Sequence, residues 1–128
     1  GCLSGEIPRA LLSGDEEKAA QITQRFLALV GSERFFLELQ HRPTMPEQTR
    51  VNDGLLRLHQ QFNVDVVATN DAHYVEPEDA EAQDILVCIQ TKRLLTDTNR
   101  LTMRNETYSL LSPKIMREHF AHIPEAID

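Results

Sequence analysis

Hydrophobic positions in the first quarter of the chain recur at helical spacing. Residues 6–13 predict a short helix that has Pro8 in its first turn and Gly14 at its end. A longer helix follows, which Asp15 can cap and Gly31 can end. Its apolar face consists of Ile22, Phe26, Leu29 and Val30. The chain therefore begins with two consecutive helices.

A strand, a helix and a second strand are predicted next. Residues 34–40 form a short, aromatic and nearly continuous apolar run, which indicates a buried strand. Thr44 as a cap and Pro46 in the first turn begin a helix that Asn63 closes. Its apolar stripe consists of Val51, Leu55, Leu58 and Phe62. The β-branched residues of 64–69 then predict a central parallel strand, so these three elements form a β-α-β unit.

The second half of the chain has a weaker pattern. A helix is expected from Pro77 to about Gln90. Residues 91–106 are polar and lack periodicity, so we expect an extended excursion or a loose hairpin rather than packed structure. Residues 108–111 predict a short strand, residues 112–120 another helix, and Pro124 a final turn. The alternation of strands and helices indicates an α/β fold.

Composition restricts the class of protein. The 128 residues, 41% of them hydrophobic, suffice for one domain or part of one, and we expect a piece of a longer protein because no initiator Met is present. No run approaches the ~20 apolar residues of a membrane helix. Two cysteines are too few for a disulfide framework, which favours a reducing, cytoplasmic location. A net charge of −7 argues against this segment gripping a nucleic-acid backbone.

Asp71 and His73 are the first candidates for chemistry. They follow the second predicted strand, and functional groups collect beyond the carboxyl ends of parallel strands. A carboxylate and an imidazole one residue apart suit zinc, manganese or iron. Tyr74 comes next and can pack beside such a site or donate its hydroxyl. On spacing alone, however, an Asp in a turn more often caps its own backbone, and a His on the solvent side is often idle.

The two cysteines receive different interpretations. Cys2 lies between two glycines in Gly-Cys-Leu-Ser-Gly, where its thiolate can serve as a soft metal ligand, although most free cysteines are small buried hydrophobes. Cys88, between Val87 and Ile89, is predicted to be such a core residue.

The histidines outside the Asp-x-His pair are expected to be solvated surface residues. These are His59, His119 and His122. His41 is the exception that geometry allows near a cleft, because it follows a strand end and has Glu38 close before it. The sequence lacks a nucleotide-binding glycine-rich loop, a nucleophile elbow and a zinc-protease helix.

Taken together, several motifs are more specific than any one residue. They are Gly-Cys-Leu-Ser-Gly-Glu-Ile-Pro at 1–8, Phe-Leu-Glu-Leu-Gln at 36–40, Val-Ala-Thr-Asn-Asp-Ala-His-Tyr at 67–74, Cys-Ile-Gln-Thr at 88–91 and Phe-Ala-His-Ile-Pro-Glu-Ala at 120–126. In this order they resemble the bacterial DNA polymerase III alpha subunits, which are C-family replicative polymerases. The resemblance covers essentially the whole chain. It implies that residues 1–128 are the C-terminal portion of a PHP domain and end at the junction with the polymerase region.

The resemblance implies a fold and a metal site. The fold would be part of a distorted seven-stranded β/α (TIM-like) barrel, in which parallel strands alternate with helices. Cys2, Asp71 and His73 fall on metal-ligand positions for Zn²⁺ or Mn²⁺, and Tyr74, Glu38 and His41 would line the site. The family's opening His-x-His would lie before Gly1, so this segment can build only part of the metal cluster.

The resemblance also implies functions. The parent protein would be a DNA-directed DNA polymerase whose PHP domain is a metal-dependent phosphoesterase with 3′–5′ proofreading activity. In the alternative, the domain is a non-catalytic structural platform that binds a separate proofreading exonuclease. The polymerase aspartates and their Mg²⁺ would lie beyond Asp128, so the segment alone is expected to be inactive.

Partners follow from the same resemblance. DNA would be bound through the parent protein rather than mainly through this segment, and other replicase subunits would bind as well. We also expect the segment itself to self-associate, because half a barrel leaves an unpaired strand edge and an apolar face.

Overall fold

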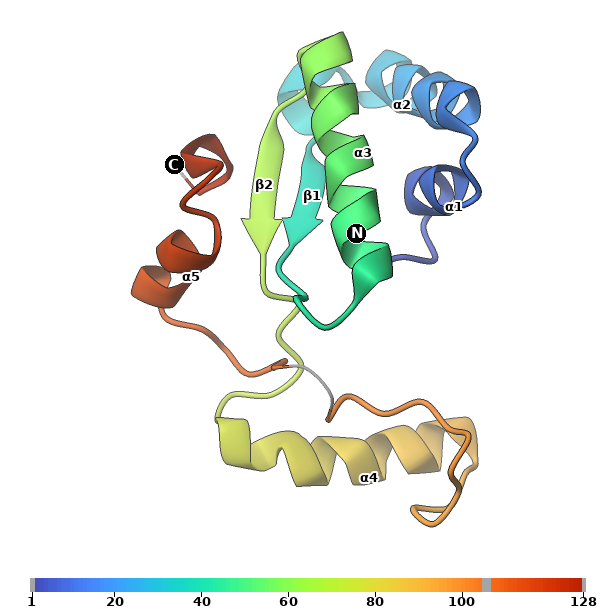
Figure 1. Cartoon of the computed structure of the whole chain (residues 1–128), viewed down its shortest axis with the longest axis vertical. Helices are drawn as coiled ribbons and strands as arrows, with labels where there is room; N and C mark the ends of the chain where they lie inside the picture. The colour runs from blue at the N-terminus through green and yellow to red at the C-terminus, as the bar shows by residue number, and fades with distance from the viewer. Residues whose placement is uncertain (1, 105–106, 128) are drawn as a thin grey trace. The chain divides into compact units, whose positions relative to one another are not determined.

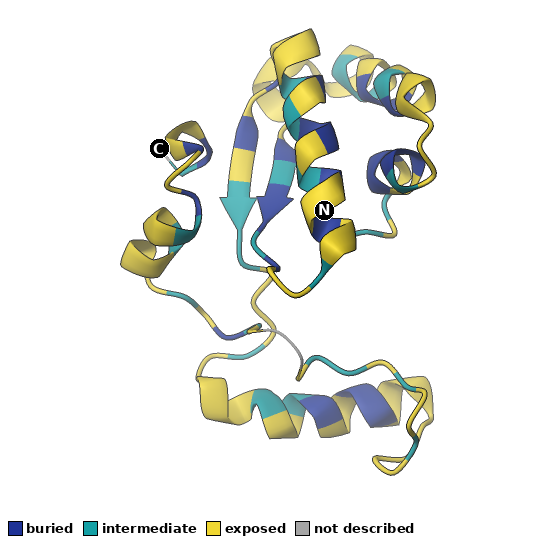
Figure 2. Ribbon diagram, viewed as in Figure 1, coloured by how far each residue is buried: buried dark blue, intermediate teal, exposed yellow. Residues whose placement is uncertain are grey.

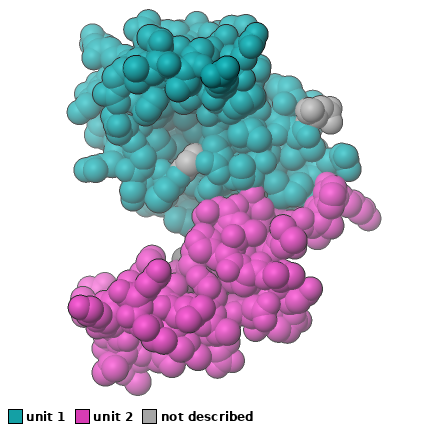
Figure 3. All heavy atoms as spheres, turned by 180° about the vertical axis from the view of Figure 1, so that it is seen from behind, with its two compact units in different colours: residues 1–69, 116–128 teal, residues 70–115 magenta. Residues whose placement is uncertain are grey.

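The computed structural model describes residues 2–104 and 107–127. The chain divides into two compact units (Figure 3). Unit 1 comprises Gly1–Thr69 and Met116–Asp128, and unit 2 comprises Asn70–Ile115. No helix in the described ranges is long and apolar enough to cross a membrane.

Two helices open unit 1 as predicted. Helix α1 spans Glu6–Leu12, and α2 spans Glu16–Val30. The carboxylate of Asp15 accepts a hydrogen bond from the backbone N–H of Lys18, which caps α2. Gly31 ends α2 with a φ of 83°, a conformation that glycine adopts without steric cost. The cap and the stop expected for α2 are therefore confirmed.

The β-α-β unit is also confirmed. Strand β1 spans Leu37–Gln40, helix α3 spans Pro46–Phe62, and strand β2 spans Val66–Thr69. The strands are parallel, with Leu37 opposite Val66 and Gln40 opposite Thr69. Helix α3 runs alongside both strands (Figure 1). Asn63 ends α3 in the left-handed conformation.

The hydrophobic core lies in unit 1, between α3, the two strands and the first two helices (Figure 2). Leu39, Val51 and Val64 are completely buried. Helices α1 and α3 approach closely at Gly54, because a Cβ built there would lie 2.7 Å from a methyl carbon of Leu11. The C-terminal segment closes this core with Phe120, Ile123 and Ala126.

Unit 2 is built around one long helix. A 3₁₀ turn at Pro77–Asp79 leads into α4, which spans Ala80–Thr91. Helix α5, Pro113–His119, begins in unit 2 and ends in unit 1. Ser112 accepts a hydrogen bond from the backbone N–H of Ile115, so it begins α5 as expected. The final turn is a 3₁₀ helix at Pro124–Ala126.

Several local predictions were wrong. The strand expected over residues 34–40 starts only at Leu37, because residues 32–34 form a 3₁₀ turn. Met45 rather than Thr44 occupies the cap position of α3, without a side-chain capping hydrogen bond. The strand expected over 108–111 is a single parallel bridge between Tyr74 and Ser109. With a single bridged position, residues 108–111 lack the consecutive backbone pairs that make a strand.

Candidate functional site

The carboxyl ends of β1 and β2 lie side by side, since Gln40 is opposite Thr69. Glu38, on β1, is half-buried and accepts hydrogen bonds from the Thr69 hydroxyl and from the side-chain amide of Gln40, the latter at 3.3 Å. Burial raises the pKa of the Glu38 carboxyl, but the N-terminal amine of the chain, through a hydrogen bond and its charge, and the bonds from Thr69 and Gln40 outweigh this and lower the pKa below its ordinary value. Glu38 is thus held as an oriented anion near the strand ends.

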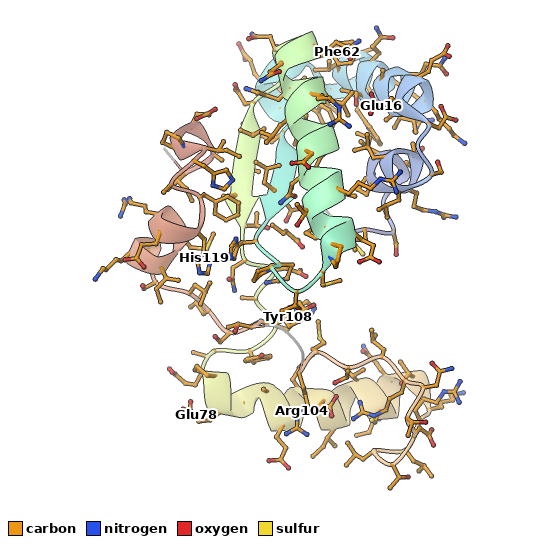
Figure 4. The ribbon with its side chains drawn as sticks, viewed as in Figure 1. Glu16, Phe62, Glu78, Arg104, Tyr108 and His119 are labelled. Atoms are coloured by element: carbon orange, nitrogen blue, oxygen red, sulfur yellow. The ribbon has the colours of Figure 1, made fainter. Side chains whose placement is uncertain are left out.

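His41 begins the loop after β1 and belongs to a group of aromatic rings. Its ring stacks on that of His119, with centroids 4.1 Å apart, and meets the ring of Phe120 edge-on. Figure 4 shows His119 at the end of α5. His41, Arg42 and His122 help line an open cavity of about 410 Å³ beside the strand end. His41 thus lies beside an open cavity at the end of β1, and its place at the predicted site stays a prediction.

The other histidines differ from the surface residues that the sequence predicted. His122 is exposed as expected. His119 is half-buried in its stack with His41, and His59 is half-buried with its Nδ1 atom 2.7 Å from the carbonyl oxygen of Val64. The prediction was wrong for these two. A histidine on a helix can form a hydrogen bond between a ring nitrogen and a nearby backbone group while its ring carbons are buried.

Asp71 and His73 follow β2, in the first residues of unit 2. Both are exposed, and Asp71 adopts a φ of 52°, a left-handed conformation that Asp tolerates better than most residues. The Nδ1 atom of His73 lies 2.7 Å from the backbone carbonyl oxygen of Asp71. Because a carbonyl oxygen only accepts, Nδ1 is the donor, and Nε2 carries the lone pair. A neutral histidine that binds a metal through Nε2 has this tautomer.

The segment around Tyr108 holds His73 in place. The backbone N–H of His73 donates to the Tyr108 carbonyl oxygen at 2.8 Å, and the two rings meet edge-on with centroids 5.5 Å apart. The Tyr74 hydroxyl accepts a hydrogen bond from the Tyr108 N–H at 3.1 Å. The Asn70 side chain donates to the carbonyl oxygen of Ser109. The loop that carries Asp71 and His73 is thus braced by side-chain and backbone bonds.

Cys2 lies in unit 1, within a turn in which the Gly5 N–H donates to the Cys2 carbonyl oxygen at 2.8 Å. Its thiol is exposed, and its sulfur accepts a hydrogen bond from the Ser4 N–H at 3.4 Å. Cys88, by contrast, is buried in α4, which confirms its prediction as a core residue.

The predicted ligands are therefore distributed over both units. Asp71 and His73 lie together in unit 2, and Cys2 belongs to unit 1. Within residues 2–104 and 107–127, no three His, Cys, Asp or Glu side chains form a group that could hold a metal ion. The assignment of Cys2, Asp71 and His73 as ligands, with Tyr74, Glu38 and His41 as lining residues, remains a prediction.

Sequence reasoning missed a buried ion pair in unit 2. The side chain of Asp84 is 1% exposed, and both of its oxygens accept 2.7 Å hydrogen bonds from the Arg100 guanidinium. The Thr102 hydroxyl adds a third bond at 2.9 Å. These bonds lower the pKa of Asp84 to about 2 although burial opposes the shift.

The excursion predicted for residues 91–106 is confirmed over residues 92–104, which form no helix or strand and are mostly exposed. The ion pair with Asp84 nevertheless attaches this segment to α4, which the sequence did not predict. A lone Asp among the apolar residues of a helix, followed by an Arg in a polar stretch, was the available signal.

No family model matches the chain. Curated relatives that match it are named DNA polymerase III subunit alpha. The Treponema pallidum protein is 37% identical over 126 residues, 98% of this chain, and the Mycobacterium tuberculosis protein is 36% identical over 129 residues, the whole chain. The Thermus aquaticus protein is 37% identical over 126 residues. The chain spans only 10–11% of the length of these relatives. Essentially the whole chain is therefore homologous to one segment, about a tenth, of DNA polymerase III subunit alpha.

Proposed function

We propose that this chain is part of a bacterial DNA polymerase III alpha subunit, a DNA-directed DNA polymerase that acts with DNA and the other replicase subunits. The observation that carries this proposal is homology over nearly the whole chain to several proteins of that name. Within that protein, the segment forms the C-terminal portion of a PHP domain. The parallel β1-α3-β2 unit is compatible with part of the seven-stranded β/α barrel of such a domain.

We further propose that this domain is a metal-dependent phosphoesterase that edits the 3′ end of a primer. The support is the loop after β2, which offers the Nε2 atom of His73 and the carboxylate of Asp71. Together with the exposed thiol of Cys2, this donor set suits Zn²⁺ or Mn²⁺. Bound there, divalent ions would polarise a phosphodiester and activate a water molecule.

Each residue has a distinct part in this proposal. The carbonyl oxygen of Asp71 fixes the His73 tautomer, and the ring of Tyr108 packs edge-on against the imidazole. Tyr74 braces the loop through its hydroxyl. Glu38 and His41 lie at the carboxyl end of β1, where a substrate or a further ion would approach. The remaining ligands would come from parts of the parent protein outside this segment.

An excision assay on the full-length subunit tests the proposal. The His73→Ala variant should lose removal of a mismatched 3′ nucleotide and should retain nucleotide incorporation, since the polymerase centre lies elsewhere. Gln60→Ala, at an exposed position of α3 away from the proposed site, is the control and should keep both activities. Unchanged excision in His73→Ala would contradict the editing function. Wild-type protein without excision but with tight binding of a separate exonuclease would favour the alternative, a structural platform.

A further inference from the structure

Two distant parts of unit 2 pair beside the proposed metal ligands. Tyr74, in the loop after β2, forms a parallel bridge with Ser109. The backbone N–H of Leu110 donates to the Tyr74 carbonyl oxygen at 3.0 Å, and the Tyr74 hydroxyl accepts a bond from the backbone N–H of Tyr108 at 3.1 Å. Residues 108–110, called the bracing segment below, therefore lie in a fixed register beside this loop.

The bracing segment makes two contacts with His73. Its Tyr108 carbonyl oxygen accepts a 2.8 Å bond from the backbone N–H of His73, and its Tyr108 ring meets the imidazole edge-on, with centroids 5.5 Å apart. His73 itself is exposed. The bracing segment and the Asp71 carbonyl oxygen, 2.7 Å from Nδ1, therefore limit the directions in which the Nε2 atom of His73 can point.

Asn70 bonds the bracing segment to the start of the loop. It is the first residue of unit 2, and its half-buried side-chain amide donates to the carbonyl oxygen of Ser109. Ser109 is 2% exposed. Because a buried carbonyl that loses its donor is costly, this bond strongly favours one position of the bracing segment relative to the loop.

The backbone between Asn70 and His73 depends on such support. Asp71 has a φ of 52°, and a non-glycine residue keeps a left-handed conformation when the surrounding contacts hold it there. Without the Asn70 amide this turn can relax. The Asp71 carbonyl oxygen would then move away from Nδ1 of His73, and the imidazole would lose the bond that selects its tautomer.

We propose that Asn70 is a positioning residue for the metal-binding loop and that it acts on His73 through the bracing segment. The Asn70 amide holds Ser109, the adjoining Tyr108 holds His73, and the imidazole presents Nε2 in one orientation. Replacing a residue that orients a ligating histidine typically weakens metal binding roughly 10- to 100-fold. The inference rests on the proposed function, because it requires His73 to be a ligand.

Zinc affinity of the full-length subunit, measured by competition with a chelator, tests the proposal. Asn70→Leu keeps the approximate size of the side chain but removes its donating amide, so it should raise the Kd for Zn²⁺ about tenfold. Asn70→Gln keeps an amide on a longer side chain and should raise the Kd less. An Asn70 that only filled space would give equal effects or the reverse order, and either result would overturn the proposal.

Thr91→Val is the matched control. The Thr91 hydroxyl donates to the Val87 carbonyl oxygen at 2.7 Å, at the C-terminal end of α4, so this variant also removes a side-chain-to-backbone bond from unit 2. Its Kd should equal that of the wild type. An equal rise of the Kd in Thr91→Val and Asn70→Leu would indicate general loosening of unit 2 and would contradict a positioning role. Thermal unfolding of each variant verifies that the subunit still folds.

Tyr74→Phe provides a second, milder variant. It removes only the hydroxyl that accepts the Tyr108 N–H bond, and it should raise the Kd by a smaller factor than Asn70→Leu. Wild-type affinity in both variants, with zinc lost from His73→Ala, would overturn this inference alone. A wild-type subunit that binds no zinc or manganese would overturn the proposed function as well, so the two failures are distinguishable.

Discussion

The two units of this chain are stabilised in different ways. Every member of the buried apolar cluster belongs to unit 1, where helices α1–α3, both strands and the C-terminal segment contribute to it. In unit 2, Val87 and Cys88 are the buried apolar side chains of the described residues, and an ion pair lies beside them. Burial of apolar area is non-directional and insensitive to pH, whereas a buried carboxylate depends on one partner and on its charge. The comparison indicates that the stability of unit 1 depends little on pH or on any one side chain, whereas that of unit 2 depends on the Asp84–Arg100 ion pair.

The largest effect is expected in the core of unit 1. Leu39→Ala removes a completely buried side chain between β1 and its covering helices, and it should lower the free energy of unfolding by about 3 kcal/mol. Urea unfolding followed by circular dichroism measures the loss. Leu29→Ala, at a position 71% exposed, should change the free energy by less than about 0.5 kcal/mol. Equal effects of the two substitutions would show that the core is not where stability resides.

Gly54 should be the next most sensitive position. A leucine there has no room against Leu11, so Gly54→Leu must displace the buried Leu11 side chain or separate α1 from α3, and it should cost about 2 kcal/mol by overpacking. The neighbouring exposed position provides the control, since Asp53→Leu should stay within about 0.5 kcal/mol in the same unfolding experiment. A Gly54→Leu chain as stable as the wild type would contradict the close helix contact.

Unit 2 should respond to the loss of one partner of its ion pair. Arg100→Met leaves the Asp84 carboxylate buried without its bidentate donor, which should loosen the attachment of residues 92–104 to α4. Hydrogen exchange should become faster there and stay unchanged in β1 and β2. Arg25→Met removes an ion pair with Glu6 whose side chains are more than half exposed, so exchange should not change. Uniformly faster exchange in both units would contradict the claim that the two units are stabilised separately.

A smaller effect, confined to acid, follows from the lowered pKa of Asp84. The folded-state pKa is about 2, compared with an ordinary value of 3.8. The carboxyl therefore binds its proton more readily in the unfolded chain, and its stabilisation is complete above about pH 4 and lost as the pH falls toward 2. Hydrogen exchange of α4 at stepped pH should show this loss, and Arg100→Met should lack it. Loosening of α4 between pH 6 and 5 would require another titrating group.

Periodicity and caps predicted unit 1 well because its structure depends on local signals and apolar burial. Asp15, Gly31, Pro46 and Asn63 each act at the helix end where the sequence placed them. The β-branched run before Thr69 likewise formed the second parallel strand. Local chemistry and long-range packing favour the same structure there, which is the condition under which sequence reasoning succeeds.

Unit 2 was predicted less well because its contacts are few, polar and distant in sequence. The pairing of Asp84 with Arg100 joins residues 16 positions apart, so it produces no periodic pattern in the sequence. The bridge between Tyr74 and Ser109 is likewise too short for a strand pattern. The candidate site also depends on contacts that the sequence pattern does not reveal. The sequence indicates Asp71 and His73 by their place after β2, but the bond that selects the His73 tautomer appears only in the structure.

The central functional claim is that His73 and Asp71 are metal ligands in the parent subunit. Metal analysis of the purified full-length protein by inductively coupled plasma mass spectrometry tests it most directly, with His73→Ala compared with Gln60→Ala. We predict bound zinc or manganese in the wild type and in Gln60→Ala, and the loss of at least one equivalent in His73→Ala. Equal metal content in all three proteins, or no metal in the wild type, would contradict the account.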